Sequence, residues 1–226
     1  MKFFKLLFIL QILFLAGSDL VQAENLKPLA QKGFLGITPV SVNANQTVEI
    51  QTVLPGSTAS SLGIKANDKL ISLNQKPIKD FTNLLSLLSE ISVGDDMTMV
   101  VKRGKKHKTL KGRMIGRPRE KSKIAIVDYG EVSWNNQRMR SITHIPNSVA
   151  NKKGKSPTIF LLQGYTCGSI DYAMVPNATT VQLINQFVAA GFIVHRVEKL
   201  GVGESEGSLK CSNVDFSTEV NGFTAG

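Results

Sequence analysis

The sequence is poor in the residues that build metal centres. Its 226 residues include three histidines and two cysteines, and none of them stands in an H-x-x-x-H or C-x-x-C arrangement. A cofactor motif is also missing, because Gly201-Val202-Gly203 is too short for a dinucleotide fingerprint, which should open a helix. We therefore expect neither a metal ion nor an organic cofactor.

Long apolar runs are missing after the N-terminus. The run "LLFILQILFLAG" follows the two lysines of "MKFFK" and precedes Val21-Gln22-Ala23. It holds about a dozen residues, fewer than the ~20 that span a bilayer. We therefore expect residues 1–23 to be a signal peptide rather than a membrane anchor, followed by a short lead over residues 24–32. The mature protein would then be exported, periplasmic or extracellular, without a membrane span.

Acidic residues are scarce in one segment. Residues 102–123, "KRGKKHKTLKGRMIGRPREKSK", hold eleven Lys or Arg and one Glu, so this segment alone carries +10, equal to the formal net charge of the whole chain. Such a patch could bind an anionic surface or nucleic acid. The alternative is a solvated hairpin followed by a linker. It contains no aromatic residue that could stack on a base. Together with export, this favours the hairpin, and we expect no nucleic-acid partner.

Residues 33–116 have the pattern of a small, mostly β module. "TVEIQTVL" (47–54) and "DKLISLN" (68–74) predict strands. "TASSLGI" predicts one helical turn closed by Gly63, and "DFTNLLSLLSEI" (80–91) predicts a helix capped by Asp80. "MTMVVKRGKKHKTLKGRMI" predicts two strands joined at residues 103–105.

The stretches "GFLGI", "VLPGSTASSLGIKANDKLISLNQKPI" and "VGDDMTMVVKRGKK" resemble the PDZ domain of exported bacterial proteases. The resemblance implies an α+β fold, a β-sandwich with helices, over residues 33–116. It also implies a groove in which loop N–H groups bind the C-terminal carboxylate of a peptide that lies as an added strand. The peptide-binding residues would be Phe34, Leu35, Gly36 and Ile37 in the loop, with Leu84 and Leu88 on the helix. One alternative is that the two leucines belong only to the core. Another is that the domain acts as a rigid spacer that gates an attached enzyme.

A polar, basic linker over residues 117–123 separates this module from residues 124–226, where the pattern changes. "KIAIVDYGEVSW" and "MRSITHIP" predict a hairpin, and "TIFLLQG" (158–164) predicts a strand buried on both faces. A helix over 179–191 then leads to a second buried strand over 192–199. A strand–helix–strand run of this length predicts a parallel pair and an α/β architecture.

The stretches "PTIFLLQGYTCGSIDY" and "GFIVHRVEKLGVGESEG" resemble the third and fourth strands of an α/β-hydrolase, with the loops that follow them. The resemblance implies acyl transfer by a serine nucleophile, in the esterase or peptidase class. It also implies that the loop after the third strand donates a backbone N–H to the oxyanion, here from Tyr165 after Gly164. Family members often have His-Gly where this chain has Gln163-Gly164, and the alternative is an ordinary turn at the end of a strand.

Residues 203–207, "GESEG", match the G-x-S-x-G pattern of a nucleophile elbow. We nevertheless reject Ser205 as the nucleophile. An elbow serine opens a helix, whereas the next helical signal begins near Asp215. Glu204 and Glu206 also place negative charge where an oxyanion would form.

The order of partners points the same way. The family triad runs serine, acid, histidine along the chain, whereas His107, His144 and His195 all precede Ser205. A different order with His144 or His195 as the base is the less favoured alternative. We therefore expect the nucleophile elbow, acid and histidine to lie beyond residue 226, so that residues 124–226 are a partial α/β-hydrolase domain, inactive alone.

The same resemblance places the loops that carry Cys167 and Cys211 at the ends of adjacent strands. A disulfide between them would close about 44 residues at the rim of the site; the alternative is two free thiols.

Three functions remain open. The first is the N-terminal portion of an exported PDZ-containing α/β-hydrolase, whose PDZ domain binds peptide or protein C-termini or gates an enzyme acting on esters or peptides. The second is a peptide-binding PDZ module without catalytic activity in this chain. The third is a protein that binds an anionic surface through residues 102–123.

Overall fold

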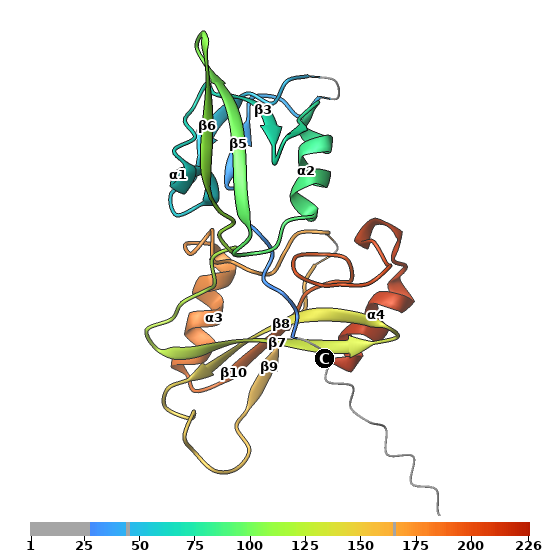
Figure 1. The fold of residues 1–226 in the computed structure, drawn as a ribbon. Helices are drawn as coiled ribbons and strands as arrows, with labels where there is room; N and C mark the ends of the chain where they lie inside the picture. The colour runs from blue at the N-terminus through green and yellow to red at the C-terminus, as the bar shows by residue number, and fades with distance from the viewer. Residues whose placement is uncertain (1–27, 44–45, 165) are drawn as a thin grey trace, which may run out of the picture.

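A computed structural model describes residues 28–43, 46–164 and 166–226. The expected signal peptide, the first part of the lead and Tyr165 therefore lie outside the described residues. Figure 1 shows two units, one above the other: the strands and helices between residues 37 and 113 form the upper unit, and those between residues 125 and 225 form the lower one. No helix in the described ranges is long and apolar enough to cross a membrane.

The upper unit combines six short strands with two helices. Two strands form a separate pair, and the other four form a sheet in the order β4-β3-β5-β6, antiparallel throughout. Its elements are β1 (Ile37–Pro39), β2 (Ile50–Val53), α1 (Thr58–Leu62), β3 (Lys69–Leu73), β4 (Lys76–Pro77), α2 (Phe81–Ser89), β5 (Asp96–Arg103) and β6 (Lys106–Arg113).

Local chemistry sets the ends of both helices in this unit. The Ser57 side chain accepts a hydrogen bond from Ser60 N at 3.2 Å, and Gly63 ends α1 in the left-handed region at φ 76°. The Asp80 side chain accepts from Asn83 N at 2.8 Å and caps α2. The core lies between the sheet and these helices, with Leu84 of α2 fully buried in it.

The basic segment has two structurally different halves. The β5–β6 hairpin carries its lysines on the surface, as is common on an edge strand such as β6. In residues 117–123, by contrast, Arg119 and Glu120 are held against the lower unit by ion pairs, while Lys121 and Lys123 are exposed. The Glu120 carboxylate accepts hydrogen bonds from Arg196 at 2.9 and 3.1 Å and from Tyr172 N at 2.7 Å.

The lower unit has a four-stranded mixed sheet in the order β7-β8-β10-β9. β7 and β8 form a long antiparallel hairpin, which turns at Asn135 and Asn136 with positive φ at both residues. β10 pairs antiparallel with β8 and parallel with β9. The elements of the lower unit are β7 (Ala125–Trp134), β8 (Gln137–Pro146), β9 (Thr158–Phe160), α3 (Thr179–Ala189), β10 (Ile193–Val197), the 3-10 turn η1 (Cys211–Asn213) and α4 (Phe216–Ala225).

The apolar run at residues 158–164 forms less strand than expected. β9 covers three residues, and Phe160 and Leu162 are 37% and 58% exposed. The expectation of a strand buried on both faces was therefore wrong. β9 lies at the edge of the sheet with β10 as its neighbour, and among the described residues no strand pairs with its other edge.

Two helices pack on the lower sheet through separate apolar clusters. Ile184 and Val188 of α3 pack with Val194 of β10. Phe223 of α4 packs in the cluster of Met139 and Val197. Since Val194 and Val197 are three residues apart on one strand, they point to opposite faces. The chain as a whole therefore has a mixed α and β architecture.

Candidate functional site

A groove of about 720 Å³ lies between strand β1 and helix α2 of the upper unit. The structure brings together all six residues that the sequence nominated for peptide binding. They line the groove from the loop and β1 on one side and from α2 on the other: Phe34, Leu35, Gly36, Ile37, Leu84 and Leu88.

Three consecutive carbonyls of the loop point into the domain. Phe34 O accepts from Thr58 N at 3.1 Å and Leu35 O from Ala59 N at 2.9 Å. Gly36 O accepts from Leu54 N at 2.9 Å. All peptide bonds in the described ranges are trans, and in a trans peptide the C=O and the following N–H point in opposite directions. The N–H groups of residues 35–37 therefore point away from the domain body, toward the groove side.

Gly36 makes this loop possible. Its φ is 69°, in the left-handed region, and a Cβ on Gly36 would lie 2.1 Å from the Ser57 Cβ. Any other residue would strain the backbone and displace the N-cap of α1. Within the described residues, neither Leu35 N nor Gly36 N has an acceptor in the protein, so both can bind an anion.

β1 also offers a free edge. It pairs with β2 on one side, and within the described residues no strand pairs with its other edge. That edge borders the groove, so an extended peptide can add to it as a strand.

The α2 wall is apolar, and its leucines have different roles. Leu84 is fully buried and belongs to the core, although it also forms the floor of the groove. Leu88 is half-buried, and Leu85 is 52% exposed in the groove wall. The sequence analysis did not nominate Leu85, although its i, i+4 spacing from Phe81 places it on the same apolar face as Leu84 and Leu88.

Comparison with known proteins agrees with this geometry. A family model described as the PDZ domain matches residues 33–112. This stretch is a PDZ domain.

The PDZ domain is related to those of DegP-type serine proteases. A probable serine protease do-like of Buchnera aphidicola subsp. Acyrthosiphon pisum is 28% identical over 123 residues, 51% of this chain and 26% of that protein. The periplasmic serine endoprotease DegP of Escherichia coli K12 is 38% identical over 60 residues, 26% of this chain and 13% of DegP. The matched part of this chain thus spans about a quarter or less of these relatives.

Among solved structures, the HtrA-type protease AlgWS227A with a decapeptide is similar at 15% identity and a TM-score of 0.36. The match covers 39% of this chain and 30% of that one.

Outside the PDZ domain, the "GESEG" loop is packed against β8. Ser205 is buried, and its Oγ accepts a hydrogen bond from Arg140 N at 3.1 Å. The next described helical turn, η1, begins only at Cys211. Both glycines are needed for packing: a Cβ on Gly203 would lie 2.4 Å from Glu198 Oε1, and one on Gly207 would lie 2.0 Å from Gln137 Oε1.

The charges that flank Ser205 are neutralised. Glu204 is buried and pairs with Arg119 at 2.6 Å and Arg140 at 2.9 Å. Glu206 pairs with Arg138 at 3.3 Å. The electrostatic objection to Ser205 therefore gives way to a geometric one, because its Oγ is buried and already hydrogen-bonded to the backbone.

The candidate oxyanion loop is described only in part. Gly164 follows β9 and accepts a hydrogen bond from Thr166 N at 2.8 Å. Tyr165, the nominated N–H donor, lies outside the described residues. Cys167 and Cys211 form a disulfide that joins this loop to η1.

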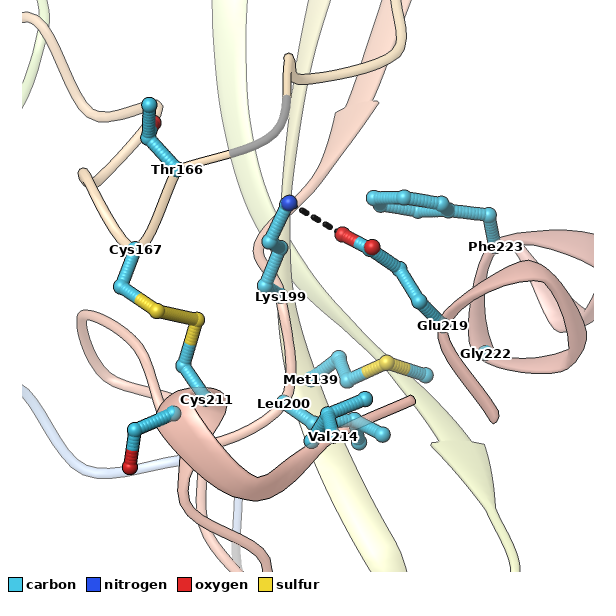
Figure 2. Close-up of a pocket in the computed structure, with 11 residues that line it drawn as sticks. Met139, Thr166, Cys167, Lys199, Leu200, Cys211, Val214, Glu219, Gly222 and Phe223 are labelled. Carbon is cyan, nitrogen blue, oxygen red and sulfur yellow. Dashed lines mark ion pairs between the residues drawn. A yellow bond between two sulfur atoms is a disulfide. The ribbon is translucent and has the colours of Figure 1, made fainter. Parts of the chain in front are cut away.

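A cavity of about 140 Å³ lies beside the disulfide (Figure 2). Figure 2 shows Lys199 and Glu219 pointing toward one another and forming an ion pair. Apolar side chains, among them Met139 and Phe223, line much of the rest of the cavity, together with Thr166 and Ser212. Within the described ranges no cluster of His, Cys, Asp or Glu could hold a metal ion.

Proposed function

We propose that the PDZ domain binds the C-terminal residues of extended peptides in the groove between β1 and α2. The observation that carries the proposal is the loop over residues 34–37, whose three carbonyls are bonded into the domain. That arrangement leaves consecutive N–H groups for a terminal carboxylate, next to a free strand edge and an apolar helix wall.

The proposal extends to compartment and context. Two relatives are named as a do-like serine protease and a periplasmic endoprotease. They support an exported, protease-associated role for this chain, in the periplasm. The partners would be proteins or peptides with exposed C-termini, held by backbone hydrogen bonds and apolar side-chain contacts.

The test uses a library of decapeptides with free C-termini, screened against the whole chain by fluorescence polarisation. Each peptide that binds is then remade with a C-terminal amide, which removes the carboxylate charge. Free-acid peptides should bind and their amides should lose most of the affinity, because the loop N–H groups recognise an anion. Equal binding of both forms would contradict carboxylate recognition.

A matched pair of variants on α2 locates the binding site. Leu85→Asn removes an exposed apolar side chain from the groove wall. Ser86→Asn is the control: it introduces asparagine at the next position, which is exposed but does not line the groove. Burying about half of a leucine contributes ~1 kcal/mol, so Leu85→Asn should weaken binding about fivefold. Ser86→Asn should bind as the parent chain does.

A second candidate function is the partial α/β-hydrolase. Two observations favour it: β9 and β10 are parallel neighbours, and the disulfide joins the loops that follow them. We propose that residues 124–226 are the opening part of such a sheet, in an esterase or peptidase that acts through a serine outside this chain. A fluorophosphonate probe should then leave the chain unlabelled, and labelling of Ser205 would refute this assignment.

A further inference from the structure

The lead segment before the PDZ domain forms part of the groove. Residues 30–32 line one end of the groove, next to residues 34–37, which we call the carboxylate-binding loop. The lead runs beside the segment that leaves the domain, through a bridge between Gly33 and Gly116 and a 2.9 Å hydrogen bond from Arg117 N to Lys32 O. One end of the groove is therefore built from residues that precede the matched PDZ domain.

The lower unit holds this lead in place. Leu29 N donates to Glu131 at 2.8 Å, and the Arg140 guanidinium donates to Leu29 O at 2.8 Å. Lys32 N donates to Glu204 Oε1 at 3.2 Å. The lead is thus bonded to the lower unit at both ends, through Leu29 and through Lys32.

Glu204 connects three segments of the chain. Its Oε1 accepts from Lys32 N in the lead. Its Oε2 accepts from Arg119, in the segment between the units, and from Arg140 Nε on β8. Glu204 and Arg140 are each 4% exposed, so the hydrogen bond between them is buried. Those from Arg119 and Lys32 N are partly buried. All three end on a carboxylate, which makes them charge-assisted and stronger than neutral ones.

We propose that Glu204 is a positioning residue for the peptide groove: it fixes residues 29–32, and through them it preorganises the groove wall and the start of the carboxylate-binding loop. The inference rests on the proposed peptide-binding function. Without the Glu204 charge, the lead must be ordered when a peptide binds, and that cost reduces affinity. The lower unit thereby sets the affinity of the PDZ domain without touching the peptide.

The test compares Glu204→Gln with Glu206→Gln in the full chain. Glu206 is in the same loop, but its carboxylate pairs with Arg138. The probe is the tightest free-acid decapeptide from the library. Ordering about one extra residue on binding corresponds to a loss of about tenfold. We expect Glu204→Gln to weaken binding by about that factor and to speed amide exchange at residues 30–37, with Glu206→Gln unchanged in both.

A purely structural role gives a different result. It would lower the melting temperature of Glu204→Gln while leaving the affinity and exchange of the folded protein unchanged, and that outcome overturns the inference. If Glu204→Gln does not fold, Arg119→Met replaces it, because Glu204 then keeps Arg140 as a partner. Arg119→Met should give a smaller loss of affinity with faster exchange in the lead, and parent-like values would refute the inference.

Failure of the proposed function would look different again. If the parent chain binds no peptide, peptide recognition is wrong. The exchange measurement then still decides whether Glu204 holds the lead: faster exchange at residues 30–37 in the Glu204 variant alone supports the positioning role, and equal exchange overturns it.

Discussion

Acid should destabilise the lower unit through His144. This residue lies on β8 and is 4% exposed. Its Nδ1 lies 3.3 Å from an Arg196 guanidinium nitrogen, and its Nε2 lies 3.3 Å from Glu120 Oε2. A neutral ring satisfies both contacts, accepting at Nδ1 and donating at Nε2, whereas a protonated ring would turn an N–H toward Arg196. Burial and the Arg196 charge lower the pKa of His144 to about 4.

The sign and size of the effect follow from this pKa. Because the folded pKa lies below the usual 6.5, the unfolded chain takes up the proton first. The contribution of neutral His144 is therefore complete above pH 6.5 and declines as the pH falls toward about 4. At 1.36 kcal/mol per pKa unit its upper bound is about 3 kcal/mol, and about 2 kcal/mol of that should be lost between pH 7.5 and pH 5.

The assay is urea unfolding followed by the fluorescence of Trp134. This is the only tryptophan in the sequence and it lies at the end of β7, so it reports on the lower unit. The free energy of unfolding is measured at both pH values for the parent chain, His144→Asn and His107→Asn. The loss in His144→Asn should be smaller than in the parent by about 2 kcal/mol, while the variant at His107, on the exposed hairpin, should match the parent. Equal losses in all three chains would refute the reasoning.

Two further predictions concern the same unit. Replacing both Cys167 and Cys211 by serine opens a loop with a sequence separation of 44 and should lower the free energy of unfolding by about 4 kcal/mol in the chain-entropy model, measured by the same urea titration; a change below ~1 kcal/mol would contradict that model. Gly207→Ala places a Cβ against Gln137 at a φ of 139°, so it should cost ~2–3 kcal/mol, and a parent-like melting temperature would contradict it.

The PDZ domain could be predicted largely from local signals. Asp80 and Gly63 cap their helices where the sequence placed them. The loop over residues 34–37 lines the groove because position 36 is a glycine. Only glycine fits the backbone conformation there, which turns the N–H groups of the loop outward. Such features depend on a few adjacent residues, and a single sequence is enough to recognise them.

The lower sheet shows where local signals end. The helix between β9 and β10 predicts that the two strands pair in parallel, and the structure confirms this pairing. The burial of residues 158–164 could not be predicted in the same way, because it depends on whether β9 has a neighbour on each side. An apolar run indicates a strand that can be buried. The position of that strand in the sheet decides how many of its residues are buried.

The segment between the units was the hardest to predict, and the reason is long-range pairing. Arg119 and Glu120 stand in a run of lysines and arginines that resembles a solvated linker. Their partners, Glu204 and Arg196, come from a distant part of the chain, and no local pattern connects them.

The same pairing explains why the "GESEG" loop resembles a catalytic motif. An elbow needs its glycines so that a serine can be exposed at a sharp turn. Here Gly203 and Gly207 leave room for Glu198 and Gln137, and the residue between the two glutamates is turned inward to bind a backbone N–H. The glycines therefore serve close packing, and Glu204 serves the contact with the lead. Substitutions in this loop should therefore change the stability of the chain and its affinity for peptides, whereas the Ser205 hydroxyl should remain unreactive.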